Sequence, residues 1–147
     1  YHDNASRARG NTGSFLSQTR TLSTIFADAM FKYKGFSVMA EYAIKSSDES
    51  PVFVDASDGL EYHFVTGSAL NIQAGYLLQS DWELAARFTS VTPEAVLAQE
   101  DVSMYTLGIS KYIDGHNLKV QSDFSMILEG DMEQSYLARL QFELSFN

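Results

Sequence analysis

The stretch YLARLQFELSF, residues 136–146, decides the fold of this chain. Apolar and polar side chains alternate along it, so that Ala138, Leu140 and Phe142 are separated by Arg139 and Gln141. A period of two residues is typical of a β-strand with two different faces, whereas a helix repeats about every 3.6 residues. The C-terminal stretch therefore predicts an amphipathic strand.

The same alternation recurs upstream, interrupted by short polar turns such as Lys34-Gly35 and Gln79-Ser80-Asp81. Connections between the alternating stretches are short and long in turn. Bacterial outer-membrane barrels have this organisation, with short periplasmic turns and longer extracellular loops. The sequence predicts seven long strands, at residues 21–34, 36–46, 64–78, 82–91, 102–113, 117–128 and 134–147.

Composition and charge exclude several classes of protein. The chain of 147 residues has a net charge of −9, which disfavours nucleic acid as a partner, and it has no cysteine for a disulfide or a Cys-based metal site. No stretch reaches the roughly 18 apolar residues of a membrane helix. Its three histidines, His2, His63 and His116, form no catalytic constellation, and nucleophile, zinc-protease and phosphate-loop motifs are missing from the sequence. We therefore expect no enzyme activity, no cofactor and no metal site among these motifs. The acidic loop that contains Asp48, Glu49 and Asp55 is most simply a solvated loop, and binding of divalent cations that bridge lipopolysaccharide is its alternative role.

Alternation alone leaves two environments open for the apolar face. It meets lipid in a membrane barrel, or a covered core in a non-conducting barrel or β-sandwich that acts as a binding or structural module. Aromatic residues gather toward the strand ends, as in the two girdles of a membrane barrel. The predicted strands also have the length of a tilted bilayer crossing. The expected girdle residues are Phe31, Tyr33, Phe36, Tyr76, Trp82, Phe88, Tyr105, Tyr136 and Phe146.

The strand count carries a further expectation about domain organisation. Seven strands would place the two chain ends on opposite sides of a membrane, whereas bacterial single-chain barrels have an even number of strands. We therefore expect residues 21–147 to be the C-terminal seven strands of a single, larger barrel domain, preceded by an extracellular loop segment at residues 1–20.

Three stretches carry a family resemblance. Phe31-Lys32-Tyr33-Lys34-Gly35-Phe36-Ser37 followed by Glu41-Tyr42, Tyr105-Thr106-Leu107-Gly108-Ile109 with Tyr112-Ile113, and the closing Leu140–Phe146 strand resemble porins of the phosphate-selective O/P family. The resemblance implies an all-β transmembrane antiparallel barrel of about 16 strands in the bacterial outer membrane, commonly a homotrimer. It also implies passage of anions, phosphate among them. One departure is that Asn147 follows Phe146, where such barrels end on an aromatic residue.

The predicted function is passive diffusion of small hydrophilic or anionic solutes through a water-filled pore, with outer-membrane lipid and lipopolysaccharide as the other partners. Charged residues on the polar face are the candidate pore lining. Acids and bases are balanced among them, so the sequence leaves the charge preference open. The alternative role of each charge is an ion pair that braces adjacent strands, as for Glu83 with Arg87 or Arg139 with Glu143. The pore-lining candidates are Asp28, Lys32, Glu41, Lys45, Glu83, Arg87, Lys119, Asp123, Arg139 and Glu143.

Overall fold

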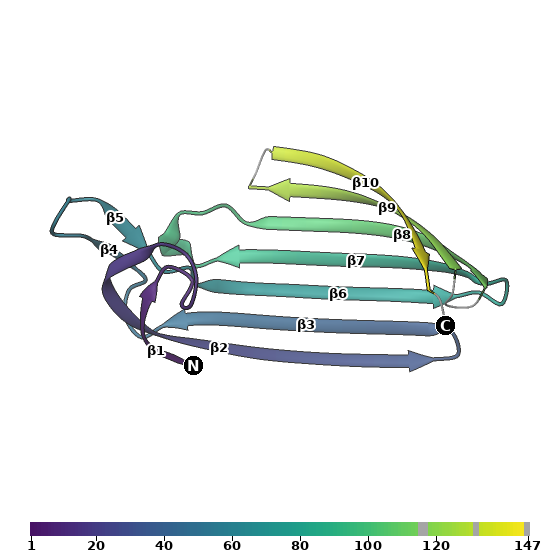
Figure 1. Ribbon diagram of the computed structural model, residues 1–147, viewed down its shortest axis with the longest axis horizontal. Coiled ribbons are helices and arrows are strands. Elements are labelled where there is room, and N and C mark those ends of the chain that lie inside the picture. Colours follow the sequence, from purple (N-terminus) through teal and green to yellow (C-terminus); the bar gives the residue numbers. More distant parts are fainter. Residues whose placement is uncertain (115–117, 131–132, 146–147) are drawn as a thin grey trace. The chain divides into compact units, whose positions relative to one another are not determined.

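A computed structural model describes residues 1–114, 118–130 and 133–145 of the chain. These residues form ten strands and one short 3-10 helix (Figure 1). The elements are β1 (His2–Arg7), β2 (Phe15–Tyr33), β3 (Phe36–Ser47), β4 (Val52–Val54), β5 (Glu61–His63), β6 (Gly67–Leu77), β7 (Trp82–Pro93), η1 (Ala95–Leu97), β8 (Val102–Asp114), β9 (Leu118–Glu129) and β10 (Glu133–Leu144).

The protein is all-β, and eight of its strands form one antiparallel sheet. Their order is β1-β2-β3-β6-β7-β8-β9-β10, while β4 and β5 pair separately. Each strand of the large sheet neighbours the next one along the chain, once the β4–β5 hairpin is set aside. Within the described ranges, no helix has the length and apolar character needed to cross a membrane.

The seven long strands predicted from alternation are all present, with bounds shifted by a few residues. The largest difference lies in residues 1–20, for which the sequence predicts an extracellular loop segment. That segment contains β1, and β2 begins at Phe15. Ala5 of β1 lies opposite Arg20 of β2, and the register shifts twice along this short pairing. Polar, irregular pairing has no two-residue period, which is why alternation missed it.

The chain divides into two compact units. The first comprises Tyr1–Ala27, Tyr42–Ala69 and Val91–Asp101. It has a small core of its own, built from Ala5, Leu22, Phe53 and Phe64. The rings of Phe53 and Phe64 lie 6.0 Å apart. Contacts between the first strands and the β4–β5 hairpin therefore hold this unit together.

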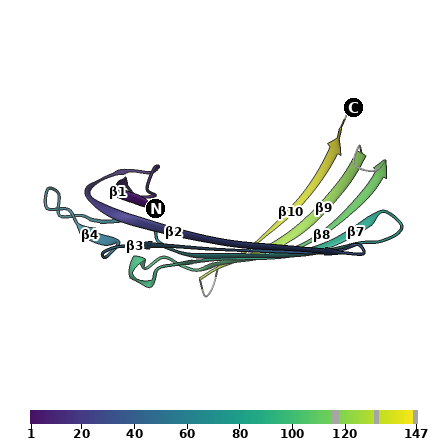
Figure 2. The same cartoon turned by 90° about the horizontal axis from the view of Figure 1, so that it is seen from below.

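The second unit comprises Asp28–Glu41, Leu70–Ser90 and Val102–Asn147. Its three last strands run side by side and curve together (Figure 2). β9 pairs with β10 from Leu118 opposite Leu144 to Glu129 opposite Glu133, without a register shift. β9 pairs with β8 over the same length, with one irregularity between Tyr112 and Asp114. This regular register fixes which side chains share a face.

Candidate functional site

The polar face of β8, β9 and β10 is a continuous surface because the register aligns polar residues in rows across the three strands. In one row, Gly108, Asp123 and Arg139 lie opposite one another. Successive side chains of a strand point to opposite faces, so every second row shares this surface. The neighbouring rows on it are Ser110–Gln121–Gln141, Tyr112–Lys119–Glu143 and Thr106–Ser125–Leu137.

Burial on β8 and β9 is the reverse of what a water-soluble protein shows, whereas β10 is exposed on both faces. Leu107 is 67% exposed, whereas its neighbour in sequence, Thr106, is only 8% exposed. Ser125 is fully buried, and its hydroxyl lies 2.8 Å from that of Thr106. Across the same sheet, Leu140 is 64% exposed. Thr106 and Ser125 are thus covered on the polar face, while Leu107 and Leu140 on the apolar face are exposed.

An ion pair connects the two last strands at mid-length. The Arg139 guanidinium donates to Asp123, with both Nη2 and Nε at 2.9 Å from Oδ1. The Asp123 side chain is 12% exposed and that of Arg139 is 50% exposed. Among the described residues, Arg139 forms its ion pair with Asp123 and not with Glu143, the alternative named from the sequence. Residues four apart in a strand are separated by about 13 Å, too far for direct contact.

The same distance applies to Glu83 and Arg87 on β7, the other ion pair considered from the sequence. Glu83 instead accepts a hydrogen bond of 2.5 Å from the Tyr112 hydroxyl on β8. The Lys119 ammonium lies 5.3 Å from the centre of the Tyr112 ring. Tyr112 therefore connects an acid and a base of the candidate set, although it is not among the predicted pore-lining residues. The sequence holds no signal for it, because a single strand does not encode the register that places Tyr112 opposite Lys119.

Arg87 lies beside a small hollow of about 90 Å³ on the polar face. Its Nε is buried and has no hydrogen-bond partner among the described residues. A buried N–H without a partner costs free energy, so a water molecule or polar solute bound in the hollow would stabilise this side chain. The hollow is lined by Gln73, Ala85, Ala86, Arg87, Thr106, Gly108, Gln121, Asp123 and Arg139.

A second group of hydrogen-bonded polar side chains connects β3, β6 and β7. Asn71 donates to Glu41 at 2.7 Å and accepts from the Thr89 hydroxyl at 3.1 Å. The uncharged members, Asn71 and Thr89, are not among the predicted pore-lining residues, because that prediction rests on charge alone. On β2, Asp28 and Lys32 are exposed, as is Glu143 on β10. These three residues lie on strands, but among the described residues they do not take part in the hydrogen bonds of Glu41, Asn71 and Thr89.

Lys45 belongs to the first unit and has a different role. Its ammonium donates to the Arg9 carbonyl oxygen at 2.9 Å. This bond ties β3 to the segment between β1 and β2. Lys45 is therefore a structural contact of the N-terminal segment as well as a pore-lining candidate.

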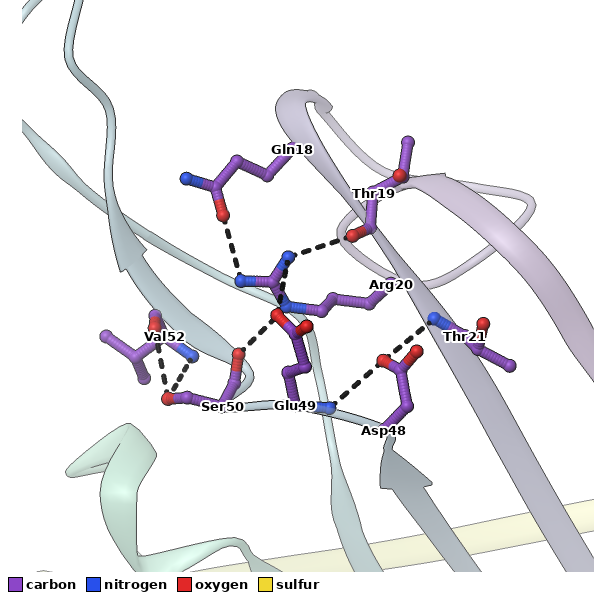
Figure 3. A network of polar contacts seen from close by, with 8 residues as sticks. All are labelled: Gln18, Thr19, Arg20, Thr21, Asp48, Glu49, Ser50 and Val52. Atoms are coloured by element: carbon purple, nitrogen blue, oxygen red, sulfur yellow. Dashed lines mark hydrogen bonds and ion pairs between the residues drawn. The ribbon is translucent and has the colours of Figure 1, made fainter.

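Arg20 is the centre of a polar network in the first unit (Figure 3). Its guanidinium donates to the side chain of Gln18 and to the Ser50 carbonyl oxygen, and it lies 3.6 Å from the Glu49 carboxylate. Asp48 accepts from the Thr21 amide nearby. This network holds the acidic segment that follows β3 against β2.

Of the nine aromatic residues expected in girdles, seven are exposed and Phe88 is half-buried, while Phe146 lies outside the described residues. Tyr105 and Tyr136 share a row with Met126 on the apolar face, and the Phe88 ring lies 5.0 Å from that of Tyr105. Trp82 is the first residue of β7, at the end of the sheet away from Tyr105. Aromatic rings therefore occur toward both ends of the apolar face. The exposed seven are Phe31, Tyr33, Phe36, Tyr76, Trp82, Tyr105 and Tyr136.

The acidic segment at residues 48–61 forms local turns. Asp55 accepts hydrogen bonds from both the amide and the hydroxyl of Ser57, and Asp58 accepts from the Tyr62 hydroxyl. His63 contacts the Gln99 side chain at 3.1 Å. In the part of the chain that the structure describes, no three acidic or histidine side chains gather as metal ligands.

The candidate site is thus a sheet face whose polar side chains are connected by hydrogen bonds and an ion pair, and the opposite face of the sheet is apolar and exposed. No protein-family model, no curated protein and no solved structure matches this chain.

Proposed function

We propose that this chain forms part of the wall of an outer-membrane β-barrel pore through which small hydrophilic solutes diffuse. One observation carries the proposal, namely the reversed burial in β8 and β9, where Thr106 and Ser125 are buried while Leu107 and Phe124 are exposed. A sheet in water covers its apolar face, whereas a barrel strand in lipid leaves that face bare and turns its polar side chains inward. Leu107 and Leu140 lie on the face that we assign to lipid.

The polar face has the chemistry of a water-filled lumen. Asp123 and Lys119 on it are partly buried, and Asp123 forms an ion pair with Arg139. Half-buried charges are costly unless they are paired or hydrated, and a lumen supplies water to those that are not paired. The buried Nε of Arg87 beside its hollow is such a group.

A non-conducting β-sandwich or binding module remains the competing function. It requires a second layer over the apolar face and leaves the polar face in bulk water. The burial of Thr106 and Ser125 on the polar face favours the pore over the sandwich. In a pore, curvature brings polar side chains together on the concave side.

The proposed solutes are small and hydrophilic. The ten pore-lining candidates comprise five acids and five bases, and a ring of one sign is what selects ions. The resemblance to phosphate-selective porins extends the proposal to anions and to a homotrimer. Reversal potentials in a salt gradient measure this preference directly.

The test uses the absence of native cysteine. Gln121 and Ser122 are adjacent on β9 but lie on opposite faces. The variants Gln121→Cys and Ser122→Cys, reconstituted in planar bilayers, are treated with a charged, membrane-impermeant thiol reagent. We expect the reagent to reduce the current through Gln121→Cys and to leave Ser122→Cys unchanged. A protein that carries no current in any salt contradicts the proposal, as does block of both variants alike.

A further inference from the structure

Lys111 occupies an unusual position on β8. In the rows that pair β8 with β9 and β10, it lies opposite Val120 and in line with Phe142, on the apolar face. Its neighbours on that face of β8 are Ile109 and Ile113, both exposed. Among the described residues of β8 on this face, from Ser103 to Lys111, Lys111 is the one with a charged side chain.

The surroundings of Lys111 hold its ammonium at the edge of the apolar face. Nζ donates to the Ser80 carbonyl oxygen at 2.6 Å, in the turn between β6 and β7. It lies 5.5 Å from the centre of the Trp82 ring. The Tyr112 amide donates to the Asp81 carbonyl oxygen, which fixes the end of β8 against this turn. Because an ammonium has three donors, Lys111 keeps two for another acceptor.

A second lysine–aromatic pair lies at the same end of the second unit. The Lys34 ammonium is 5.2 Å from the centre of the exposed Tyr33 ring, in the turn between β2 and β3. The Leu77 amide donates to the Gly35 carbonyl oxygen, so this turn lies beside the end of β6. Both pairs therefore belong to the short-turn end of the sheet.

We propose that this end binds the phosphate of anionic phospholipid headgroups, with Lys111 and Trp82 as the principal site and Lys34 with Tyr33 as a second. The inference rests on the proposed membrane function. Amphipathic rings stay at the headgroup level, and a lysine on an apolar face directs its ammonium toward the same level. Short turns of barrels face the periplasm, and the leaflet on that side is phospholipid.

Charge complementarity selects the headgroup. The chain carries a net charge of −9 and on average repels an anionic surface. Lys111 is a cation that the fold nevertheless holds among apolar side chains. A lysine near a membrane surface attracts anionic lipid, and phosphate is an acceptor that ammonium groups bind well.

The chain offers an internal probe, because Trp82 is its sole tryptophan. Fluorescence of the reconstituted protein is measured in vesicles of phosphatidylcholine mixed with phosphatidylglycerol, with bromine on the acyl chains of one lipid at a time. Bromine quenches tryptophan on contact, so the two series give the relative binding of each lipid beside Trp82. We expect phosphatidylglycerol to be preferred about fivefold in the wild-type protein.

Three variants test the assignment. Lys111→Gln keeps a donor for Ser80 but removes the charge, so we expect the two lipids to bind about equally beside Trp82. Lys111→Arg keeps the charge, so we expect it to retain the preference for phosphatidylglycerol. The matched control is Lys119→Gln, which removes a lysine from the polar face of the adjacent strand and is expected to leave the preference unchanged. An unchanged preference in Lys111→Gln overturns the proposal, and so does an equal loss in Lys119→Gln.

Two outcomes separate this proposal from the pore. Quenching of Trp82 by both lipids without preference overturns the headgroup site and leaves the membrane barrel standing. No quenching by either lipid contradicts membrane insertion itself. Lipid A added as a third component tests which leaflet the short-turn end contacts. If the site beside Trp82 binds lipid A in preference to phosphatidylglycerol, the assignment to phospholipid is overturned.

Discussion

Arg139 on β10 lies directly opposite Asp123 on β9, and its guanidinium binds the carboxylate at 2.9 Å. Half of the arginine side chain is exposed, whereas the aspartate is nearly covered. The pair joins two neighbouring strands in the middle of the polar face.

The first prediction concerns the strength of this pair. Arg139→Gln, Asp123→Asn and the double variant form a double-mutant cycle, measured as the free energy of unfolding by urea in lipid vesicles. We expect a coupling free energy of about 0.5–1 kcal/mol, since the exposed arginine weakens the attraction. Glu143→Gln serves as the control. Strictly additive effects of the two substitutions would show that the pair contributes nothing to stability.

The second prediction compares the two faces of β10. Leu140→Arg places a charge on the face assigned to lipid and should destabilise the protein in bilayers by about 2–4 kcal/mol. Gln141→Arg, its neighbour on the polar face, should change stability by about 0.5 kcal/mol or less. Both side chains are exposed. Unfolding titrations in vesicles measure the difference, and equal effects would contradict a lipid-facing Leu140.

The third prediction concerns the small core of the first unit. Phe64 is fully buried, so Phe64→Ala should cost about 3–5 kcal/mol of local stability. Val54→Ala, at an exposed position of the β4–β5 hairpin, is the control. Hydrogen exchange followed by mass spectrometry should lose protection at residues 51–64 and retain it in β9. Equal loss in β9 would mean that the two units unfold together.

The fourth prediction concerns pH. Hydrogen bonds from the Ser17 hydroxyl, then from the hydroxyl and the amide of Ser57, hold the pKa of Asp55 below its ordinary value of 3.8. Because the folded-state pKa is lowered, the Asp55 carboxylate stabilises the loop at pH values above the ordinary pKa. This stabilisation disappears as the pH falls through the folded-state pKa.

An NMR titration of the Asp55 carboxyl carbon measures this effect. Ser57→Ala removes the hydroxyl donor and should raise the pKa toward the ordinary value. Ser50→Ala, whose hydroxyl bonds within its own turn, should leave the titration unchanged. A wild-type midpoint at or above the ordinary value would refute the assignment.

The long strands were predictable because each repeats apolar and polar residues over ten or more positions. β1 was not, because its sequence HDNASR has no alternation and its pairing with β2 is irregular. The β4–β5 pair has three residues in each strand, too few for a period to emerge.

The polar face was predicted as a set of charges but not as a set of contacts. Which residue binds Arg139 depends on the register between β9 and β10, and a single strand does not encode its register. Tyr112 illustrates the same limit. Its hydroxyl reaches Glu83 on β7, a contact between strands whose alignment the sequence leaves open.

The unbroken register between β9 and β10 also constrains how this protein evolves. Inserting or deleting one residue within β9 exchanges the two faces for every residue that follows in the strand. We expect substitutions that preserve polarity to be tolerated there and changes of length to be excluded. Homologous sequences should therefore differ in length within the loops, such as residues 48–60 and 94–101, while β9 keeps a constant number of residues.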